Sequence, residues 1–180
     1  MPALADFLPK VYEITSRPDL VAETTGFLTR ALMKAHLAGD YRFDLQTLTI
    51  PNTEGQEFSA DLPARFRKEQ WVYTKDFRIH NVTPAALYDQ QVQMEKQNTY
   101  YIGGSSINFN IKDHYELVTF DYLQYPTYAD SYIASTFPDI LTYLASAYVF
   151  SLLKNTEAAQ RWAGLARDID VELIRNTFVI

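Results

Sequence analysis

The residues of this chain that could do acid–base or nucleophilic chemistry are few and scattered. Its 180 residues include three histidines and no cysteine, so thiol catalysis and disulfides are excluded. The densest reactive group is Asp113-His114-Tyr115-Glu116, which offers an acid, a base and a phenol. Consecutive residues of a strand point to opposite faces, so these side chains would not converge, and a surface corner is the better interpretation. His36 falls in a helical segment and His80 beside a short strand.

A glycine-rich run is the second place where chemistry could occur. Gly103-Gly104-Ser105-Ser106 lacks the lysine of a phosphate-binding loop and the G-x-S-x-G spacing that exposes a nucleophilic serine. The run lies between Thr99–Ile102 and Ser106–Asn110, two strand-like segments, so it predicts a β-hairpin turn. We therefore find no enzyme signature, no catalytic residue, no cofactor site and no metal site in the sequence.

Charged residues are unevenly distributed along the chain. Arg65, Arg67 and Lys68 form the densest basic group, whereas no Lys or Arg occurs between Lys112 and Lys154. A basic face on one copy could meet an acidic face on another, which would steer association. An ordinary mixed surface explains the same pattern, because exposed ion pairs contribute little energy. Both interpretations stay open at this point.

Tyrosine is unusually frequent, with 13 residues in the chain, and Tyr101 and Tyr122 lie in strand-like segments. Tyr carries an apolar ring and a polar tip, which suits a surface that becomes buried on assembly. It is also a good strand residue on a half-exposed sheet. We treat Tyr101 and Tyr122 as candidate partner contacts.

The elements that must position these residues begin and end with helices. Apolar residues recur at helical spacing from Leu141 to Leu152, after a start marked by Thr136, Pro138 and Asp139. A second stripe, from Ala158 to Leu173, predicts a helix packed against the first. Near the N-terminus, Ser16-Arg17-Pro18-Asp19 repeats this pattern of a hydroxyl residue, a proline and an acidic residue. The repeat predicts a helix over about Pro18–Ala38.

The middle of the chain is rich in strand patterns separated by turn residues. We expect an α+β fold in a single domain, in which N- and C-terminal helices (about 1–40 and 136–175) form a bundle. An antiparallel β-rich module (about 41–128) is inserted between them, and it contains a polar helix over Pro84–Met94. The tail at 176–180 ends in the apolar residues Phe178, Val179 and Ile180, which we predict to contact a partner.

Composition limits the possible functions. Hydrophobic residues make up 47% of the chain, which suffices for a core. No apolar run approaches the roughly 20 residues of a membrane span, and no basic segment precedes an apolar one at the N-terminus. We therefore expect a soluble protein made in the cytoplasm. The net charge of −6 argues against a surface that binds nucleic acid over its whole area.

The order of these segments resembles the head-to-tail adaptor proteins of tailed, especially short-tailed, bacteriophages. The matching segments follow one another along nearly the whole chain. They are Leu62-Pro63-Ala64-Arg65-Phe66-Arg67-Lys68, Val82-Thr83-Pro84, Tyr100-Tyr101-Ile102-Gly103-Gly104, Phe120-Asp121-Tyr122, Tyr125-Pro126, Phe137-Pro138-Asp139 and Ala158-Ala159-Gln160-Arg161-Trp162. These are structural motifs without reactive groups, and their order carries the likeness.

The resemblance implies a virion structural protein at the head–tail interface. In that family twelve copies form a ring between the portal and the tail nozzle, and double-stranded DNA passes through the lumen without sequence-specific binding. The helices would build the ring, the β module would contact tail proteins, and the C-terminal segment would reach toward the portal. The alternative is a binding module whose tyrosine-rich sheet, including Tyr101 and Tyr122, contacts a glycan or another protein outside a portal complex.

Overall fold

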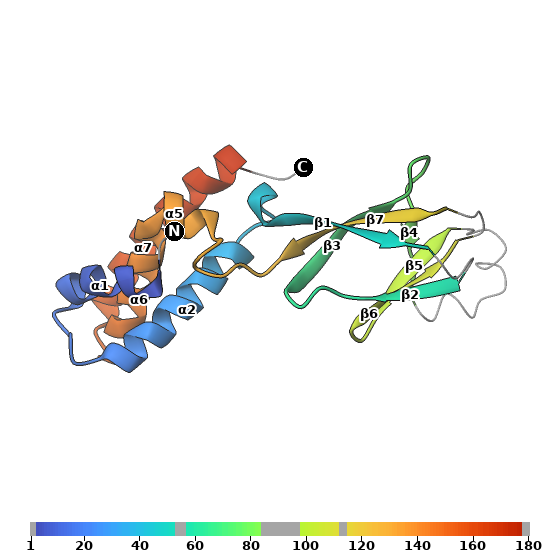
Figure 1. Cartoon of the computed structure of the whole chain (residues 1–180). Helices are drawn as coiled ribbons and strands as arrows, with labels where there is room; N and C mark the ends of the chain where they lie inside the picture. Colours follow the sequence, from blue (N-terminus) through green and yellow to red (C-terminus); the bar gives the residue numbers. More distant parts are fainter. Residues whose placement is uncertain (1–2, 53–56, 84–97, 112–114, 178–180) are drawn as a thin grey trace. The chain divides into compact units, whose positions relative to one another are not determined.

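The protein has a mixed α+β fold in two compact units (Figure 1). The structure is a computed structural model, and it describes residues 3–52, 57–83, 98–111 and 115–177. The first unit, here called the helical unit, comprises Met1–Asp44 and Tyr125–Ile180. The second, here called the β unit, comprises Leu45–Gln124. Each unit has its own cluster of buried hydrophobic residues.

The described helices all belong to the helical unit. They are the 3-10 helices η1 (Leu4–Asp6) and η2 (Arg42–Asp44), and the α-helices α1 (Leu8–Thr15), α2 (Val21–Leu37), α5 (Tyr132–Thr136), α6 (Pro138–Leu152) and α7 (Thr156–Thr177). Helix α6 contacts α7, α2, α1 and α5, so it occupies the centre of this unit.

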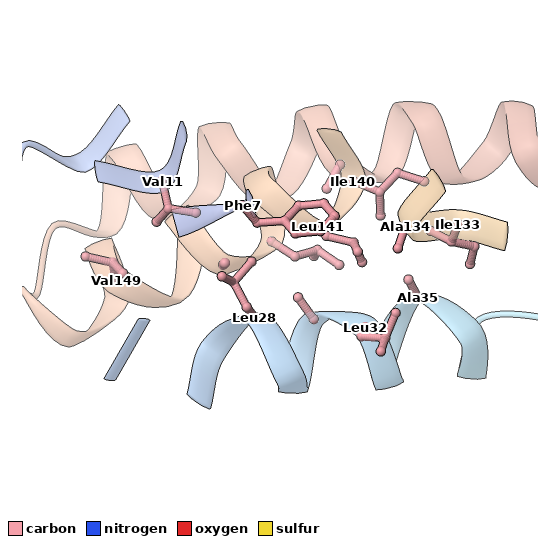
Figure 2. Packing of buried hydrophobic residues seen from close by; sticks show 14 of the residues in the cluster. Phe7, Val11, Leu28, Leu32, Ala35, Ile133, Ala134, Ile140, Leu141 and Val149 are labelled. Atoms are coloured by element: carbon pink, nitrogen blue, oxygen red, sulfur yellow. The ribbon is translucent and has the colours of Figure 1, made fainter. Parts of the chain in front are cut away.

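Helix α6 is central because most of its surface is apolar. Figure 2 shows Leu28, Leu32 and Ala35 of α2 directed toward α6, which carries Ile140 and Leu141. Leu28, Ile140 and Leu141 are fully buried. Each such side chain contributes about 1.5–3 kcal/mol relative to exposure. The predicted α6 stripe is confirmed at Leu141, Leu144, Ala145 and Val149, which are buried.

Two predicted helix starts need correction. Ser16 does not cap α2, because it adopts a left-handed conformation (φ 54°) and ends α1. Arg17 donates two hydrogen bonds to Asp19, at 2.8 and 2.7 Å, which holds the pKa of the Asp19 carboxyl below its ordinary value. Helix α2 therefore begins at Val21. Thr136 is the last residue of α5, a short helix that the sequence pattern did not predict, although Pro138 does open α6 as expected.

Two leucines of the predicted stripes are not in the core. Leu152 is 49% exposed at the end of α6, and Leu165 is 38% exposed on α7. The chain turns directly after Leu152 through Lys154, whose positive φ of 58° directs it into α7. Helix α7 contacts α6 along Ala159 and Ala166, so Leu165 points away from that contact. Periodicity identified the helices correctly but overestimated the width of their buried faces.

The strands belong to the β unit and form two sheets. They are β1 (Leu45–Pro51), β2 (Glu57–Asp61), β3 (Phe66–Tyr73), β4 (His80–Asn81), β5 (Thr99–Gly103), β6 (Ser106–Asn110) and β7 (Leu117–Gln124). A three-stranded sheet has the order β1-β7-β3, and a four-stranded sheet has the order β2-β6-β5-β4. All pairs are antiparallel except β4 with β5.

One hydrophobic cluster holds the two sheets together. It includes Val118 and Phe120 from the three-stranded sheet and Ile107 and Phe109 from the four-stranded sheet. The predicted hairpin at β5 and β6 is confirmed, and Gly104 adopts the left-handed conformation (φ 63°) that its turn requires. The inward face of β7 is also as predicted.

Part of the sequence prediction falls on residues that the structure does not describe. The predicted helix over Pro84–Met94 lies outside the described residues, as does the corner at Lys112-Asp113-His114. Phe178, Val179 and Ile180 likewise lie outside them.

Candidate functional site

A carboxylate, an imidazole and a hydroxyl converge inside the helical unit. The Nδ1 atom of His36 lies 2.8 and 2.9 Å from the two carboxylate oxygens of Asp44. Its Nε2 atom lies 2.8 Å from the Oγ atom of Ser131. A carboxylate only accepts hydrogen bonds, so Nδ1 carries a proton and donates it to Asp44. The Nε2 atom is the second ring nitrogen and forms the hydrogen bond with the Ser131 hydroxyl. We call these three residues the His36 network.

Three separate elements position the His36 network. His36 lies in the last turn of α2, and Asp44 ends η2, where the chain leaves the helical unit. Ser131 is the N-cap of α5, and its Oγ accepts a hydrogen bond of 3.0 Å from the backbone N–H of Ala134. The network therefore ties Asp44, the last residue before the β unit, and the N-cap of α5 to the end of α2.

The surroundings of the network decide what it can do. His36, Asp44 and Ser131 are 0%, 3% and 4% exposed. The rings of Tyr41 and Phe43 meet the imidazole edge-on, and Phe43 stacks on Tyr132 at a centroid distance of 4.7 Å. The connectivity matches a Ser-His-Asp triad, but a substrate carbonyl must reach the serine oxygen for acyl transfer. The burial closes that access, and the arrangement supports a structural role.

Sequence reasoning missed this network. Asp44 and Ser131 are 8 and 95 positions from His36, and no motif joins residues at those separations. The available signal was weak: a histidine in the last turn of an amphipathic helix has to be satisfied when it faces the core. His36 was assigned to a helix, and its partners could not be named.

A groove on the helical unit is the second candidate site. It lies among α2, α6 and α7 and has a volume of about 340 Å³. Its lining is mainly apolar and small on the two long helices. The lining residues are Lys34, Leu144, Ala147, Tyr148, Ser151, Thr156, Ala159, Gln160 and Ala163. A groove with alanines along its wall allows another helix or loop to approach closely.

Cationic side chains border this groove. The guanidinium carbon of Arg30 lies 4.8 Å from the ring centroid of Tyr148, and the Lys34 Nζ lies 5.9 Å from it. Farther along α7, burial raises the pKa of the Asp170 carboxyl, and the positive charge of Lys34 opposes that rise. The Oδ1 atom of Asp170 has no hydrogen-bond partner among the described residues. The lining of the groove is therefore mainly apolar, and Lys34 contributes a positive charge to it.

The basic residues predicted as partner contacts lie at the start of β3. Arg65 is in the turn before β3 and is half-buried, and Lys68 is exposed. The register of β3 against β7 shifts between Phe66 and Lys68, which leaves Arg67 as the extra residue of a β-bulge. Lys68 pairs with Leu123, which places it on the face of the three-stranded sheet that points away from the cluster between the sheets.

The two candidate tyrosines do not share a surface. Tyr122 packs between the sheets against Phe66 and Phe120 and is partly buried. Tyr101 alternates with Tyr100 and Ile102, which belong to that cluster, so Tyr101 points away from it on the other sheet. These two positions therefore do not form one aromatic platform.

A different aromatic surface lies on the outer face of the three-stranded sheet. Val72 points into the core, so its strand neighbours Trp71 and Tyr73 point outward. Asp121 is paired with Trp71 in register and accepts a hydrogen bond of 2.6 Å from the Thr47 hydroxyl. Burial, followed by the Asp121 carboxylate, raises the pKa of Tyr73.

Acidic residues in the stretch without Lys or Arg are largely engaged within the fold. Asp121 holds Thr47, Asp130 accepts hydrogen bonds from Thr127, and Asp139 lies 3.3 Å from the Lys10 Nζ. This leaves less free negative charge for a partner than the sequence suggests. The idea that a basic face of one copy meets an acidic face of the next is correspondingly weaker.

Other kinds of site find no support in the described part of the chain. Among those residues, no three His, Asp or Glu side chains gather closely enough to hold a metal ion. No helix there combines the length and the apolar character needed to cross a membrane. Comparison with models of protein families finds no match, and comparison with curated proteins finds none either.

Proposed function

We propose that this chain is a virion structural protein, a subunit of a ring-shaped head-to-tail adaptor. The observation that carries the proposal is the groove among α2, α6 and α7, whose small and mainly apolar lining suits contact with another polypeptide. The best-formed polar constellation, the His36 network, is closed to substrates and suits a scaffold. The protein then acts by assembly and not by catalysis.

Exposed leucines on the same helices support this role. Leu152 and Leu153 are 49% and 37% exposed at the end of α6, and Leu165 is 38% exposed on α7. Burial of apolar surface contributes about 25 cal/mol per Å², so covering these side chains would favour association. Subunits of a cyclic ring meet through two different surfaces. The groove of one copy would receive a different face of the next copy.

The finer architecture belongs to the same proposal. The N- and C-terminal helices form a bundle that builds the ring, and the inserted β module faces tail proteins. Twelve copies would join the portal to the tail nozzle, and the segment containing Phe178, Val179 and Ile180 would reach toward the portal. DNA would pass through the lumen, and the net charge of −6 is consistent with a conduit that does not hold phosphates tightly.

The experiment combines purified protein with a portal ring and measures the mass of the complex. The protein alone can remain monomeric, because the portal can serve as the template for assembly. We expect wild-type protein to add to the portal as a ring. Failure to join the portal, both as free protein and on capsids, would contradict the proposal.

A substitution in the groove makes the test specific. Ala163→Trp should fill the groove and block ring formation, because a large ring replaces a methyl group in its wall. Asp168→Trp is the matched control, since Asp168 is exposed on the same helix and does not line the groove. Both variants should retain wild-type circular dichroism. Equal assembly of the two would refute the role of the groove.

Glycan binding is the second candidate function, and one surface favours it. Trp71 and Tyr73 point outward on the three-stranded sheet, and aromatic rings suit contact with a sugar. Titration with a panel of free saccharides tests it. Saturable binding that is lost in Trp71→Ala would support this function, and absence of binding to every saccharide would remove it.

A further inference from the structure

The two sheets of the β unit have four edge strands, and three of them are protected against pairing. Strand β3 has two register shifts, and its end is covered where the N–H of Ile79 donates to the carbonyl of Val72. Strand β2 has Glu57 and Asp61 at its ends, and β4 has only two residues. Bulges, charges and shortness are the usual protections of sheet edges.

Strand β1 lacks these protections. Its sequence, Leu-Gln-Thr-Leu-Thr-Ile-Pro, has no charge, and its register with β7 is regular over seven residues. No described residue pairs with its other side. Long, flat and uncharged edges invite pairing with another strand.

The hydrogen bonds between β1 and β7 show which backbone N–H groups of β1 face away from β7. The N–H of Asn52 donates to the carbonyl of Glu116 on the β7 side, at 2.9 Å. Because backbone groups alternate along a strand, Gln46, Leu48 and Ile50 also face β7. The N–H groups of Leu45, Thr47 and Thr49 then face the open edge. Pro51, which has no N–H, closes the row on that side.

We propose that the open edge of β1 is a docking site for an extended strand of a tail-side partner, which adds to the three-stranded sheet. The inference rests on the proposed adaptor function and names the mode by which the β unit would contact the tail. Main-chain hydrogen bonds provide the attraction in this mode, and alternate side chains provide the selectivity.

The chemistry of the edge defines the partner segment. It is uncharged, because no charged side chain of β1 offers an ion pair. It places an apolar residue beside Leu48, which is half-buried at the margin of the cluster between the sheets. It leaves polar residues beside Thr47 and Thr49 on the outer face.

A second copy of β1 is the competing occupant. Antiparallel pairing of two β1 strands about Leu48 would place Thr47 opposite Thr49 and would create a two-fold contact. A ring with cyclic symmetry cannot repeat such a contact around its circumference, since neighbours there meet through different surfaces. A partner strand is compatible with the ring.

Amide-resolved hydrogen exchange tests the proposal on three samples: free protein, the portal–adaptor complex, and that complex with the tail nozzle protein of the same virus. We expect the Thr47 and Thr49 amides to exchange rapidly in the first two samples and at least about tenfold more slowly in the third. Protection already present without the nozzle would identify a second copy as occupant and overturn the proposal. Rapid exchange in all three samples would also overturn it.

A pair of variants isolates the backbone donor. Thr49→Pro removes the outward N–H, whereas Thr49→Ala removes the same hydroxyl and keeps the N–H. Thr49 is exposed, and its N–H is not part of the ladder with β7. Both variants should join the portal, but Thr49→Pro should bind the nozzle at least about tenfold more weakly than Thr49→Ala. Equal nozzle binding would refute the docking site, whereas failure of wild-type protein to join the portal would refute the adaptor function instead.

Discussion

Replacing His36 with alanine should destabilise the helical unit strongly. The substitution removes the imidazole whose Nδ1 donates to Asp44 at 2.8 Å and whose Nε2 lies 2.8 Å from the Ser131 Oγ. Asp44 is 3% exposed, so its carboxylate stays buried after losing that donor. A buried group that loses a hydrogen-bond partner costs about 1–3 kcal/mol, and more when that group is charged. A domain is stable by only about 5–15 kcal/mol, so the loss is a large part of the total.

The two tryptophans allow this effect to be measured in one unit. Trp162 belongs to the helical unit and Trp71 to the β unit. In a Trp71→Phe background, urea unfolding followed by tryptophan fluorescence reports on the helical unit alone. We expect His36→Ala to lower the free energy of unfolding by at least about 1–3 kcal/mol in that experiment.

Two further variants separate the network from simple loss of volume. Ser131→Ala removes one hydrogen bond to His36 and the N-cap of α5, which should cost about 1–2 kcal/mol. His36→Ala and Asp44→Ala should be non-additive, and the double variant should cost less than the sum by more than about 1 kcal/mol. A cost below about 1 kcal/mol for His36→Ala, or simple additivity, would refute the reasoning.

Three more substitutions probe other parts of the fold. Burial raises the pKa of the Asp170 carboxyl, so the folded protein binds that proton more tightly than the unfolded chain, and stability falls as the pH rises through the shifted pKa. Asp170→Asn should therefore raise the thermal midpoint at neutral pH. This gain should vanish below the ordinary Asp pKa of 3.8. An unchanged midpoint would contradict this. Gly104→Val should cost about 1–2 kcal/mol in urea unfolding, because its φ is 63°, and a neutral effect would show that the turn relaxes. Phe120→Ala should cost about 3–5 kcal/mol, seen through Trp71 in a Trp162→Phe background, and an equal loss seen through Trp162 would show that the two units unfold together.

The sequence predicted the elements whose own periodicity defines them. Helix α6 was predictable because Leu141 and its neighbours recur at helical spacing, and Pro138 marks the start. The hairpin of β5 and β6 was predictable because Gly104 supplies a positive φ between two strand patterns. In each case the determining interactions lie within a few residues of one another.

The wrong predictions involve alternatives with similar local signals. Ser16 could cap the next helix or end the previous one, and the left-handed conformation at Ser16 follows from the end of α1. Thr136 looked like a cap because nothing in its pattern reveals that Tyr132–Thr136 is itself a helix, capped by Ser131. Short helices depend on tertiary contacts and carry little signal of their own.

The candidate sites were less predictable than the fold because each one brings together residues that are far apart in the sequence. Tyr101 and Tyr122 are 21 positions apart, and only the pairing of their strands reveals that they face different surfaces. Trp71, paired with Asp121, was not singled out, since a single aromatic residue in a strand is ordinary. The period of two along each strand would have identified outward positions once the inward ones were known.

The His36 network should affect how tightly a partner strand binds to the open edge of β1. Asp44 immediately precedes β1, so the strand that offers its edge begins one residue after the residue held by His36. A strand added to β1 gains the most if β1 is already fixed, because ordering a loose edge on binding would cost conformational entropy. His36→Ala should therefore weaken nozzle binding although His36 belongs to the helical unit and is not part of the edge. Unaltered binding in a variant that remains folded would show that β7 alone is enough to hold β1 in place.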